Sequence, residues 1–207
     1  MEYEVRFYYS KKEYENIFNK LEKINILKNN GRNYEKTIQY NSTDPLNDFY
    51  SKEIDGRFRV RLTKGVINTC KISWKRRLPD TINSNINKEE EIELSIIPDE
   101  YNNLINIILN VLKMTEVECY ERYRTSFIND EIEIAIDEYP FGIALEIECK
   151  SKNNEEEIID KYVKLLGLNY NDSYILSWDD KYEELCIEQN IEKSNKVLFG
   201  NNMPEIK

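Results

Sequence analysis

Histidine is absent from this sequence of 207 residues. Its absence excludes Ser-His-Asp and Cys-His catalysis, histidine-ligated zinc and an imidazole general base. If the chain is an enzyme, its chemistry must therefore come from carboxylates, lysine, arginine, tyrosine or a metal ion that carboxylates hold.

Cysteine and long apolar runs are also scarce. The four cysteines form no CxxC pair and lie far apart, at Cys70, Cys119, Cys149 and Cys186. This spacing favours small core residues in a reducing compartment over a disulfide framework or a zinc site. The longest apolar run, residues 104–112, is interrupted by two asparagines and is too short to span a bilayer. The chain also begins without the basic and apolar regions of a signal peptide. We therefore expect a soluble, cytoplasmic protein with no membrane partner.

The charge balance is acidic overall but locally reversed. Lysine and arginine number 29 against 39 aspartates and glutamates, so the formal net charge is −10. This balance argues against a broad basic surface for nucleic acid. Residues 57–77 nevertheless contain eight basic side chains and no acidic one. The basic side chains are therefore concentrated where a local anionic group, rather than an extended polyanion, would bind.

Hydrophobic periodicity predicts alternating strands and helices in one domain over residues 1–190, followed by a frayed tail over 191–207. Strands are expected over residues 2–7, 34–40, 57–62, 69–77, 89–96, 117–127, 131–137 and 145–150. Helices are expected after a capping box at 10–13, over 98–113, from 155 to a stop at Gly167, and over about 173–189. Gly31 is expected to end the first helical segment, and polar loops are expected over 41–48 and 79–87.

The strands carry charged residues at every second position, and this pattern allows two interpretations. One is a sheet whose charged face meets solvent. The other is a closed barrel in which helices cover the apolar faces and the charged faces line a polar tunnel. The apolar stripes of the predicted helices need an apolar sheet surface to cover, but the spacing alone leaves both interpretations open.

Paired carboxylates add a chemical argument. Glutamates occur at i and i+2 in four strands, at positions 2 and 4, 91 and 93, 131 and 133, and 146 and 148. Like charges this close on one buried face repel unless something neutralises them. Divalent cations do so with oxygen ligands, whereas arginine and lysine clusters favour phosphate oxygens. Acidic and basic clusters in one cavity are therefore typical of a metal and polyphosphate site.

The motif Glu2-Tyr-Glu-Val-Arg6 resembles the N-terminal ExExK/R strand of the triphosphate tunnel metalloenzymes. This superfamily includes the CYTH proteins (class IV adenylyl cyclase and thiamine triphosphatase) and the metal-dependent RNA 5′-triphosphatases of fungal and viral capping systems. Further motifs follow in the family's order, at residues 58–61, 71–75, 88–93, 122–124, 136–138 with Gly142, and 145–148. The resemblance extends from residue 2 to about residue 178.

This resemblance implies an α+β fold, a closed eight-stranded antiparallel β-barrel with flanking helices. It implies a Mg²⁺ or Mn²⁺ ion held by Glu2, Glu4, Asp137, Glu146 and Glu148. It implies that the triphosphate is bound by Arg6, Arg59, Arg61, Lys71, Lys75, Arg122 and Arg124. It also implies catalytic roles, in aiding the metal or the attacking water, for Glu91, Glu93 and Glu133.

The expected activity is hydrolysis of the γ-phosphate of a triphosphate. The substrate is either an RNA 5′ end, as in mRNA capping, or a small molecule such as tripolyphosphate or thiamine triphosphate. Arg6 stands where CYTH enzymes usually carry lysine and resembles viral capping enzymes, whereas residues 137–142 and 145–148 resemble CYTH proteins. A class IV-type adenylyl cyclase, a non-catalytic polyphosphate- or nucleotide-binding module, and a charged sheet protein remain alternatives. The pattern decides neither the metal nor the oligomeric state.

Overall fold

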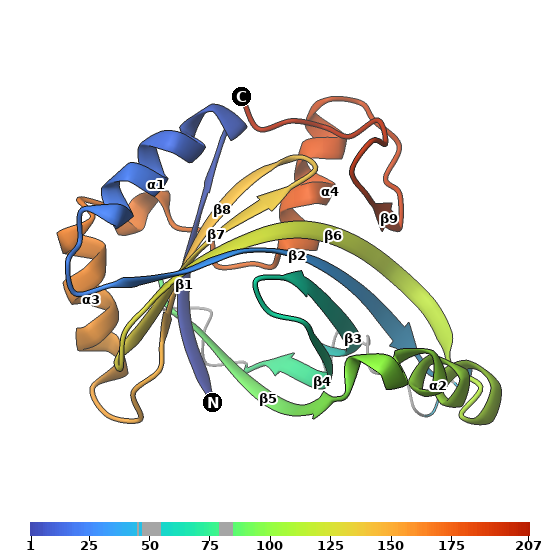
Figure 1. The fold of residues 1–207 in the computed structure, drawn as a ribbon. Helices are drawn as coiled ribbons and strands as arrows, with labels where there is room; N and C mark the ends of the chain where they lie inside the picture. Colours follow the sequence, from blue (N-terminus) through green and yellow to red (C-terminus); the bar gives the residue numbers. More distant parts are fainter. Residues whose placement is uncertain (45, 47–54, 79–84) are drawn as a thin grey trace.

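Eight strands form one closed sheet in the computed structural model, which describes residues 1–44, 46, 55–78 and 85–207 (Figure 1). The strands are β1 (Glu2–Tyr9), β2 (Lys28–Asn41), β3 (Gly56–Gly65), β4 (Thr69–Arg77), β5 (Asn87–Ile96), β6 (Thr115–Ile128), β7 (Ile132–Tyr139) and β8 (Gly142–Cys149). Their order is β2-β3-β4-β5-β1-β8-β7-β6, and pairing of β6 with β2 closes the ring. Every neighbouring pair in the ring is antiparallel. The predicted α+β fold and its eight-stranded antiparallel barrel are confirmed.

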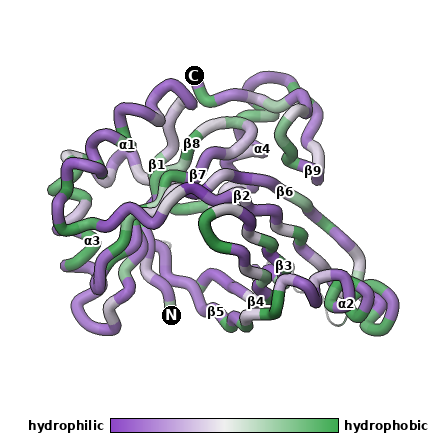
Figure 2. The backbone as a smooth tube through the Cα atoms, in the orientation of Figure 1, coloured by the Kyte–Doolittle hydropathy of each residue, from purple (hydrophilic) through white to green (hydrophobic). Residues whose placement is uncertain are grey.

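Helices cover the apolar outer face of the barrel. Val5 and Phe7 on β1 are buried in a cluster with side chains of α1 (Tyr14–Glu22) and α3 (Glu155–Leu165), two helices on the same side of the barrel (Figure 1). Hydrophilic and hydrophobic residues alternate along the strands (Figure 2). Because side chains alternate between the two faces of a strand, burial of the apolar set outside places the charged set inside. The barrel interpretation of the charge pattern is therefore the correct one.

Two further helices cover other parts of the outer face. α4 (Trp178–Glu188) packs in a cluster with residues of β6, β7 and β8. α2 (Tyr101–Asn106) follows a 3-10 turn and continues as one π-helical turn, in place of the regular helix predicted over 98–113. The four cysteines are buried and free, as predicted. Among the described residues, no helix has the length and apolarity needed to cross a bilayer.

β2 begins six residues earlier than predicted, and Gly31 lies inside it rather than ending the first helix. The pairing of β2 with β6 shifts register between Asn29 and Arg32, and Gly31 has a φ of +86° at this irregularity. A glycine adopts this left-handed conformation readily, so it suits a β-bulge. Of the loops predicted over 41–48 and 79–87, residues 45, 47–48 and 79–84 lie outside the described residues, and Asn41 and Asn87 belong to β2 and β5.

The tail predicted to fray packs against the barrel instead. A short ninth strand, β9 (Lys196–Val197), pairs in parallel with β6, and Val197 is buried. Farther on, the amide of Ile206 donates a hydrogen bond to the carbonyl of Phe141 at 2.9 Å. The few apolar side chains of this polar segment therefore reach the edge of the α4 cluster and hold the tail in place.

Candidate functional site

The interior of the barrel contains a cavity of about 280 Å³ whose lining is mostly polar. Eight acidic and eight basic side chains line it, with neutral residues between them. The charged lining residues are Glu2, Glu4, Arg6, Glu35, Arg59, Arg61, Lys71, Lys75, Glu91, Glu93, Arg122, Arg124, Glu133, Glu146, Glu148 and Lys150. The structure thus brings together every predicted site residue except Asp137, which is buried behind the lining.

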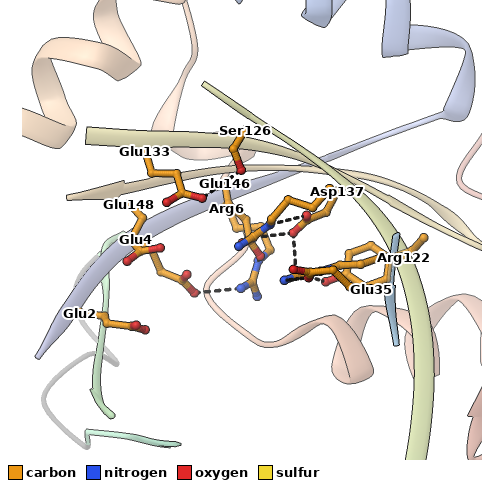
Figure 3. Close-up of polar contacts among 12 residues, drawn as sticks. Glu2, Glu4, Arg6, Glu35, Arg122, Ser126, Glu133, Asp137, Glu146 and Glu148 are labelled. Atoms are coloured by element: carbon orange, nitrogen blue, oxygen red, sulfur yellow. Dashed lines mark hydrogen bonds and ion pairs between the residues drawn. The ribbon is translucent and has the colours of Figure 1, made fainter. Parts of the chain in front are cut away.

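Three carboxylates form a row across adjacent strands at one side of the cavity. Glu4 on β1 is the register partner of Glu148 on β8, and Glu148 is in turn the partner of Glu133 on β7. Directly opposed side chains of antiparallel strands have Cβ atoms about 5 Å apart. We call these three residues the carboxylate row; Glu2, two positions before Glu4, lies beside it (Figure 3).

The carboxylate row is partly neutralised from within the chain. The Lys150 ammonium lies 2.8 Å from Glu148 Oε1 and 3.2 Å from Glu133 Oε2. The Ser126 hydroxyl donates to Glu133 Oε1 at 3.0 Å. Burial raises the pKa of Glu148, and the nearby Glu2 and Glu133 add to this effect while Lys150 opposes it. A divalent cation would therefore stabilise the ionised carboxylates of Glu148 and Glu133 more than the single charge of Lys150 does.

A network of arginines and carboxylates lies next to the row. Arg6 donates from Nε to Glu146 Oε1 and from a terminal nitrogen to Glu4 Oε1, both at 2.8 Å. Arg124 also donates to Glu146 and binds both oxygens of Asp137 at 2.7 Å. Burial alone would raise the pKa of Glu146, but Arg6 and Arg124 hold it well below its usual range. We call Arg6, Arg122 and Arg124, with Glu35, Asp137 and Glu146, the arginine network.

Arg122 extends this network to the opposite wall. Its Nε donates to Glu35 Oε2 at 2.7 Å, and a terminal nitrogen donates to Asp137 Oδ2 at 2.6 Å. Arg122 and Asp137 are both buried. Asp137 was expected to hold the metal, but both of its oxygens accept hydrogen bonds from guanidinium groups. Its geometry is that of a residue that orients two arginines.

The remaining predicted phosphate-binding residues are also paired with acids. Arg59 contacts Glu91 at 3.0 Å and Lys71 contacts Glu93 at 2.6 Å. Lys75 lies 2.5 Å from both Glu2 and Glu89. Arg61 lies 3.8 Å from Glu35. The interior is therefore close to electroneutral, and a bound cation and anion would each exchange an internal partner for a new one.

Three residues that contact the site, Glu35, Glu89 and Lys150, were not predicted from the sequence. The signal for Glu35 was present, because residues 33, 35, 37 and 39 of β2 are polar and alternate with the residues that face outward. Lys150 continues the alternation of Glu146 and Glu148. Glu89 shares the alternation of Glu91 and Glu93 on β5, but its place beside Glu2 follows from the pairing of β5 with β1.

The start of α4 lies across one end of the barrel. Trp178 lines the cavity and packs on Tyr120, with ring centroids 4.2 Å apart. Arg57 donates to the Ser177 hydroxyl at 3.1 Å, and Arg77 lies 3.8 Å from Asp180. These contacts tie the start of α4 to the ends of β3 and β4, and they hold Trp178 beside Tyr120 in the lining of the cavity.

The donor set suits a divalent metal in its chemistry. Glu2 and the carboxylate row offer the hard oxygen ligands that Mg²⁺ and Mn²⁺ prefer. Within the described part of the chain, however, no three acidic or cysteine side chains converge as a ready metal site. Glu2, Glu4 and Glu148 each turn toward a basic partner, Lys75, Arg6 and Lys150 respectively. These carboxylates would therefore have to leave their partners, at least in part, to hold a metal.

Comparisons with known proteins agree with this architecture. The model of the CYTH domain family matches residues 1–172. The PH1012 protein of Pyrococcus horikoshii is similar in structure, with 20% identity, a TM-score of 0.65, and coverage of 86% of this chain and 97% of that chain. A putative adenylate cyclase from Vibrio parahaemolyticus has 14% identity, a TM-score of 0.61, and coverage of 86% and 96%.

A third similar structure is described by its activity. The putative adenylyl cyclase HpAC1 from Hippeastrum, described as revealing a dominant triphosphatase activity, has 13% identity, a TM-score of 0.58, and coverage of 94% of this chain and 99% of that chain. At these identities the structural likeness shows the fold alone. None of the curated proteins compared with this sequence matches it.

Proposed function

This chain belongs to the CYTH domain family, and from that premise we propose that it is a metal-dependent triphosphatase that hydrolyses the terminal phosphate of a triphosphate inside its cavity. The observation that carries the proposal is a cavity lined by eight acidic and eight basic side chains, in which three carboxylates on β1, β8 and β7 form a row. The other lining residues include seven arginines and lysines that can contact phosphate. A cation and a polyphosphate can bind side by side in such a cavity.

In this proposal Glu2, Glu4, Glu148 and Glu133 hold a Mg²⁺ or Mn²⁺ ion. When bound, the metal offsets phosphate charge and makes a coordinated water more acidic. Asp137 and Glu146, which the family resemblance suggests as metal ligands, are bonded to arginines here, so we assign them to orienting Arg6, Arg122 and Arg124.

The basic side chains bind the triphosphate and stabilise charge that develops on the transferred phosphoryl group. Phosphoryl transfer depends chiefly on positioning and electrostatics, so rigidly held donors are effective. Arg6, Arg122 and Arg124 are held in this way by buried acids. Glu91 and Glu93, the carboxylates that pair with Arg59 and Lys71, are positioned to accept a proton from the attacking water once those cations contact phosphate.

The lining favours a small triphosphate as the substrate. The cavity volume of about 280 Å³ is modest, and the aromatic residues Tyr120, Tyr139 and Trp178 line the cavity and pack on one another. Phosphate groups find partners on the charged walls, whereas a nucleoside would remain at the mouth. Tripolyphosphate or thiamine triphosphate is therefore our first candidate, and an RNA 5′ end that inserts only its triphosphate is the second.

A panel of substrates tests the proposal. Phosphate release is measured from tripolyphosphate, thiamine triphosphate, ATP and triphosphate-ended RNA, each with Mg²⁺ and with Mn²⁺. We expect orthophosphate release that requires the metal and is lost in Glu148→Gln. Glu90→Gln is the matched control, because Glu90 pairs with Arg76 outside the cavity lining and should retain activity.

The same panel separates the alternatives. Pyrophosphate and a cyclic nucleotide formed from ATP would identify an adenylyl cyclase, the activity after which the similar Vibrio protein is named. Binding of tripolyphosphate without turnover under either metal would identify a non-catalytic binding module. Either result would overturn the triphosphatase proposal.

A further inference from the structure

Lys150 is a cavity residue for which the proposed function has no role. It directly follows β8 and continues the inward-facing alternation of Glu146 and Glu148. The seven basic residues proposed to bind phosphate do not include it. Its position beside the carboxylate row, rather than among the arginines, calls for a separate explanation.

The contacts of Lys150 place a positive charge where a metal would be held. Its Nζ lies 2.8 Å from Glu148 and 3.2 Å from Glu133. These two glutamates are register partners on neighbouring strands, so their carboxylates repel each other. One ammonium between them removes that repulsion, and a divalent cation that uses the same oxygens would do the same. Both cations therefore compete for one set of ligands.

The Lys150 ammonium is also able to move away from the carboxylates of Glu148 and Glu133. The Lys150 side chain is 41% exposed, whereas those of Arg6 and Arg122 are 10% and 4% exposed. A lysine at the end of a strand can turn its flexible stem and place the ammonium in water at little cost. The arginines have no such route, because Arg6 is bonded on two sides and also donates to the Leu176 carbonyl.

We propose that Lys150 is a built-in counter-ion that a divalent metal displaces: it neutralises Glu148 and Glu133 in the metal-free chain and turns away when the metal binds. The inference rests on the proposed metal site. It means that metal affinity is set by a competition, and that removal of the ammonium should tighten metal binding rather than weaken it.

Binding of Mn²⁺ alone, measured by isothermal titration calorimetry, tests this inference in wild type, Lys150→Met and Lys150→Arg. We expect the Met variant to bind Mn²⁺ about fivefold more tightly, the scale of a partly exposed ion pair. The Arg variant keeps the charge and should bind like wild type. Lys161→Met is the matched control, because Lys161 pairs with Glu131 outside the cavity lining.

A second measurement uses the unaltered protein. Acylation of lysine amines, read by mass spectrometry, should increase at Lys150 when Mn²⁺ is added, with Lys161 as the internal reference. Unchanged or weaker Mn²⁺ binding by a folded Lys150→Met protein would overturn the inference. If that variant does not fold, unchanged acylation of Lys150 in Mn²⁺-bound wild type would overturn it. Failure of wild type to bind Mn²⁺ at all would refute the proposed metal site itself, and the inference with it.

Discussion

Arg124 binds both carboxylate oxygens of Asp137, with N–O distances of 2.7 Å to each. Arg122 donates to the same carboxylate at 2.6 Å, and the Asp137 side chain has no exposed surface. A single acid thus fixes two guanidinium groups that face the cavity. This arrangement connects the stability of the barrel to the geometry of its site.

Asp137→Ala is therefore expected to be strongly destabilising. It would leave two buried guanidinium groups short of a partner, and breaking a buried ion pair in this way costs about 3–5 kcal/mol of unfolding free energy. Chemical denaturation measures the loss. Asp160→Ala is the control, because Asp160 forms an exposed pair with Lys164 on α3 and should cost about 0.5 kcal/mol or less. Equal losses for the two variants would contradict the role assigned to Asp137.

Lys75 and Arg76 are adjacent in β4 but face opposite sides of the barrel wall. Lys75 lines the cavity beside Glu2, whereas Arg76 pairs with Glu90 outside the cavity lining. We expect Lys75→Met to lower kcat/KM for the triphosphate by about 100-fold, the scale of one lost electrostatic contact to a reacting group. Arg76→Met should change it by less than about twofold. Steady-state kinetics on the two purified proteins decides the matter, and similar losses would argue against the cavity as the site of reaction.

Glu118 on β6 should make stability depend on pH. Burial raises its pKa from 4.5 to about 7, and Asp179 adds to the rise while Lys193 and Arg57 oppose it. Between about pH 4.5 and pH 7 the folded state binds more protons than the unfolded state. The free energy of unfolding therefore falls as pH rises through this window. Glu118→Gln removes that loss. At pH 8 the free energy of unfolding of the variant should exceed that of wild type by on the order of 2 kcal/mol. At pH 4 the two free energies should be equal.

Denaturation curves at several pH values provide the measurement. Glu116→Gln, a change at an exposed position of the same strand, is the control and should follow the wild-type pH profile. A Glu118→Gln protein that loses stability in parallel with wild type between pH 5 and 8 would contradict the assignment.

The absence of a side chain at Gly142 leaves room for Ile206 of the C-terminal tail. A Cβ atom there would lie 2.5 Å from Ile206 Cδ1 and 3.1 Å from the Tyr9 carbonyl. Gly142→Ala should therefore destabilise the protein by about 1–2 kcal/mol through overpacking. In a Gly142→Ala, Ile206→Ala double variant the cost of the first change should fall, because the shorter side chain leaves room. A double-mutant cycle by denaturation measures this coupling, and strict additivity would show that the tail does not pack on the turn in solution.

Periodicity and charge predicted most of the strands and their charged faces but left an open sheet and a barrel as alternatives. The resemblance to the triphosphate tunnel metalloenzymes predicted the barrel and most of the residues that line its cavity. In β4 the alternation of Lys71, Ser73 and Lys75 with Ile72 and Trp74 identifies an inner and an outer face. The alternation holds for strand after strand, but it does not by itself say whether the charged faces meet solvent or an interior. The order of the motifs along the chain then completed the prediction.

The pairing between strands could not be predicted in the same way. Asp137 was expected near the site, but its contact with Arg124 depends on the register between β6 and β7. The docked tail was missed for a related reason: Val197 and Ile206 are isolated apolar residues in a polar segment and show no period. Such side chains reveal their role only when the surface they meet is known.

Trp178 and Tyr120 pack on each other where the start of α4 meets the ends of β3 and β4, and both line the cavity. If these rings close that end and the proposed triphosphatase activity is correct, substrate would enter and products would leave through the same opening. A polymer could then present its terminus but could not pass through the barrel, so each binding event would remove a single terminal phosphate. A product that dissociates slowly would act as an inhibitor.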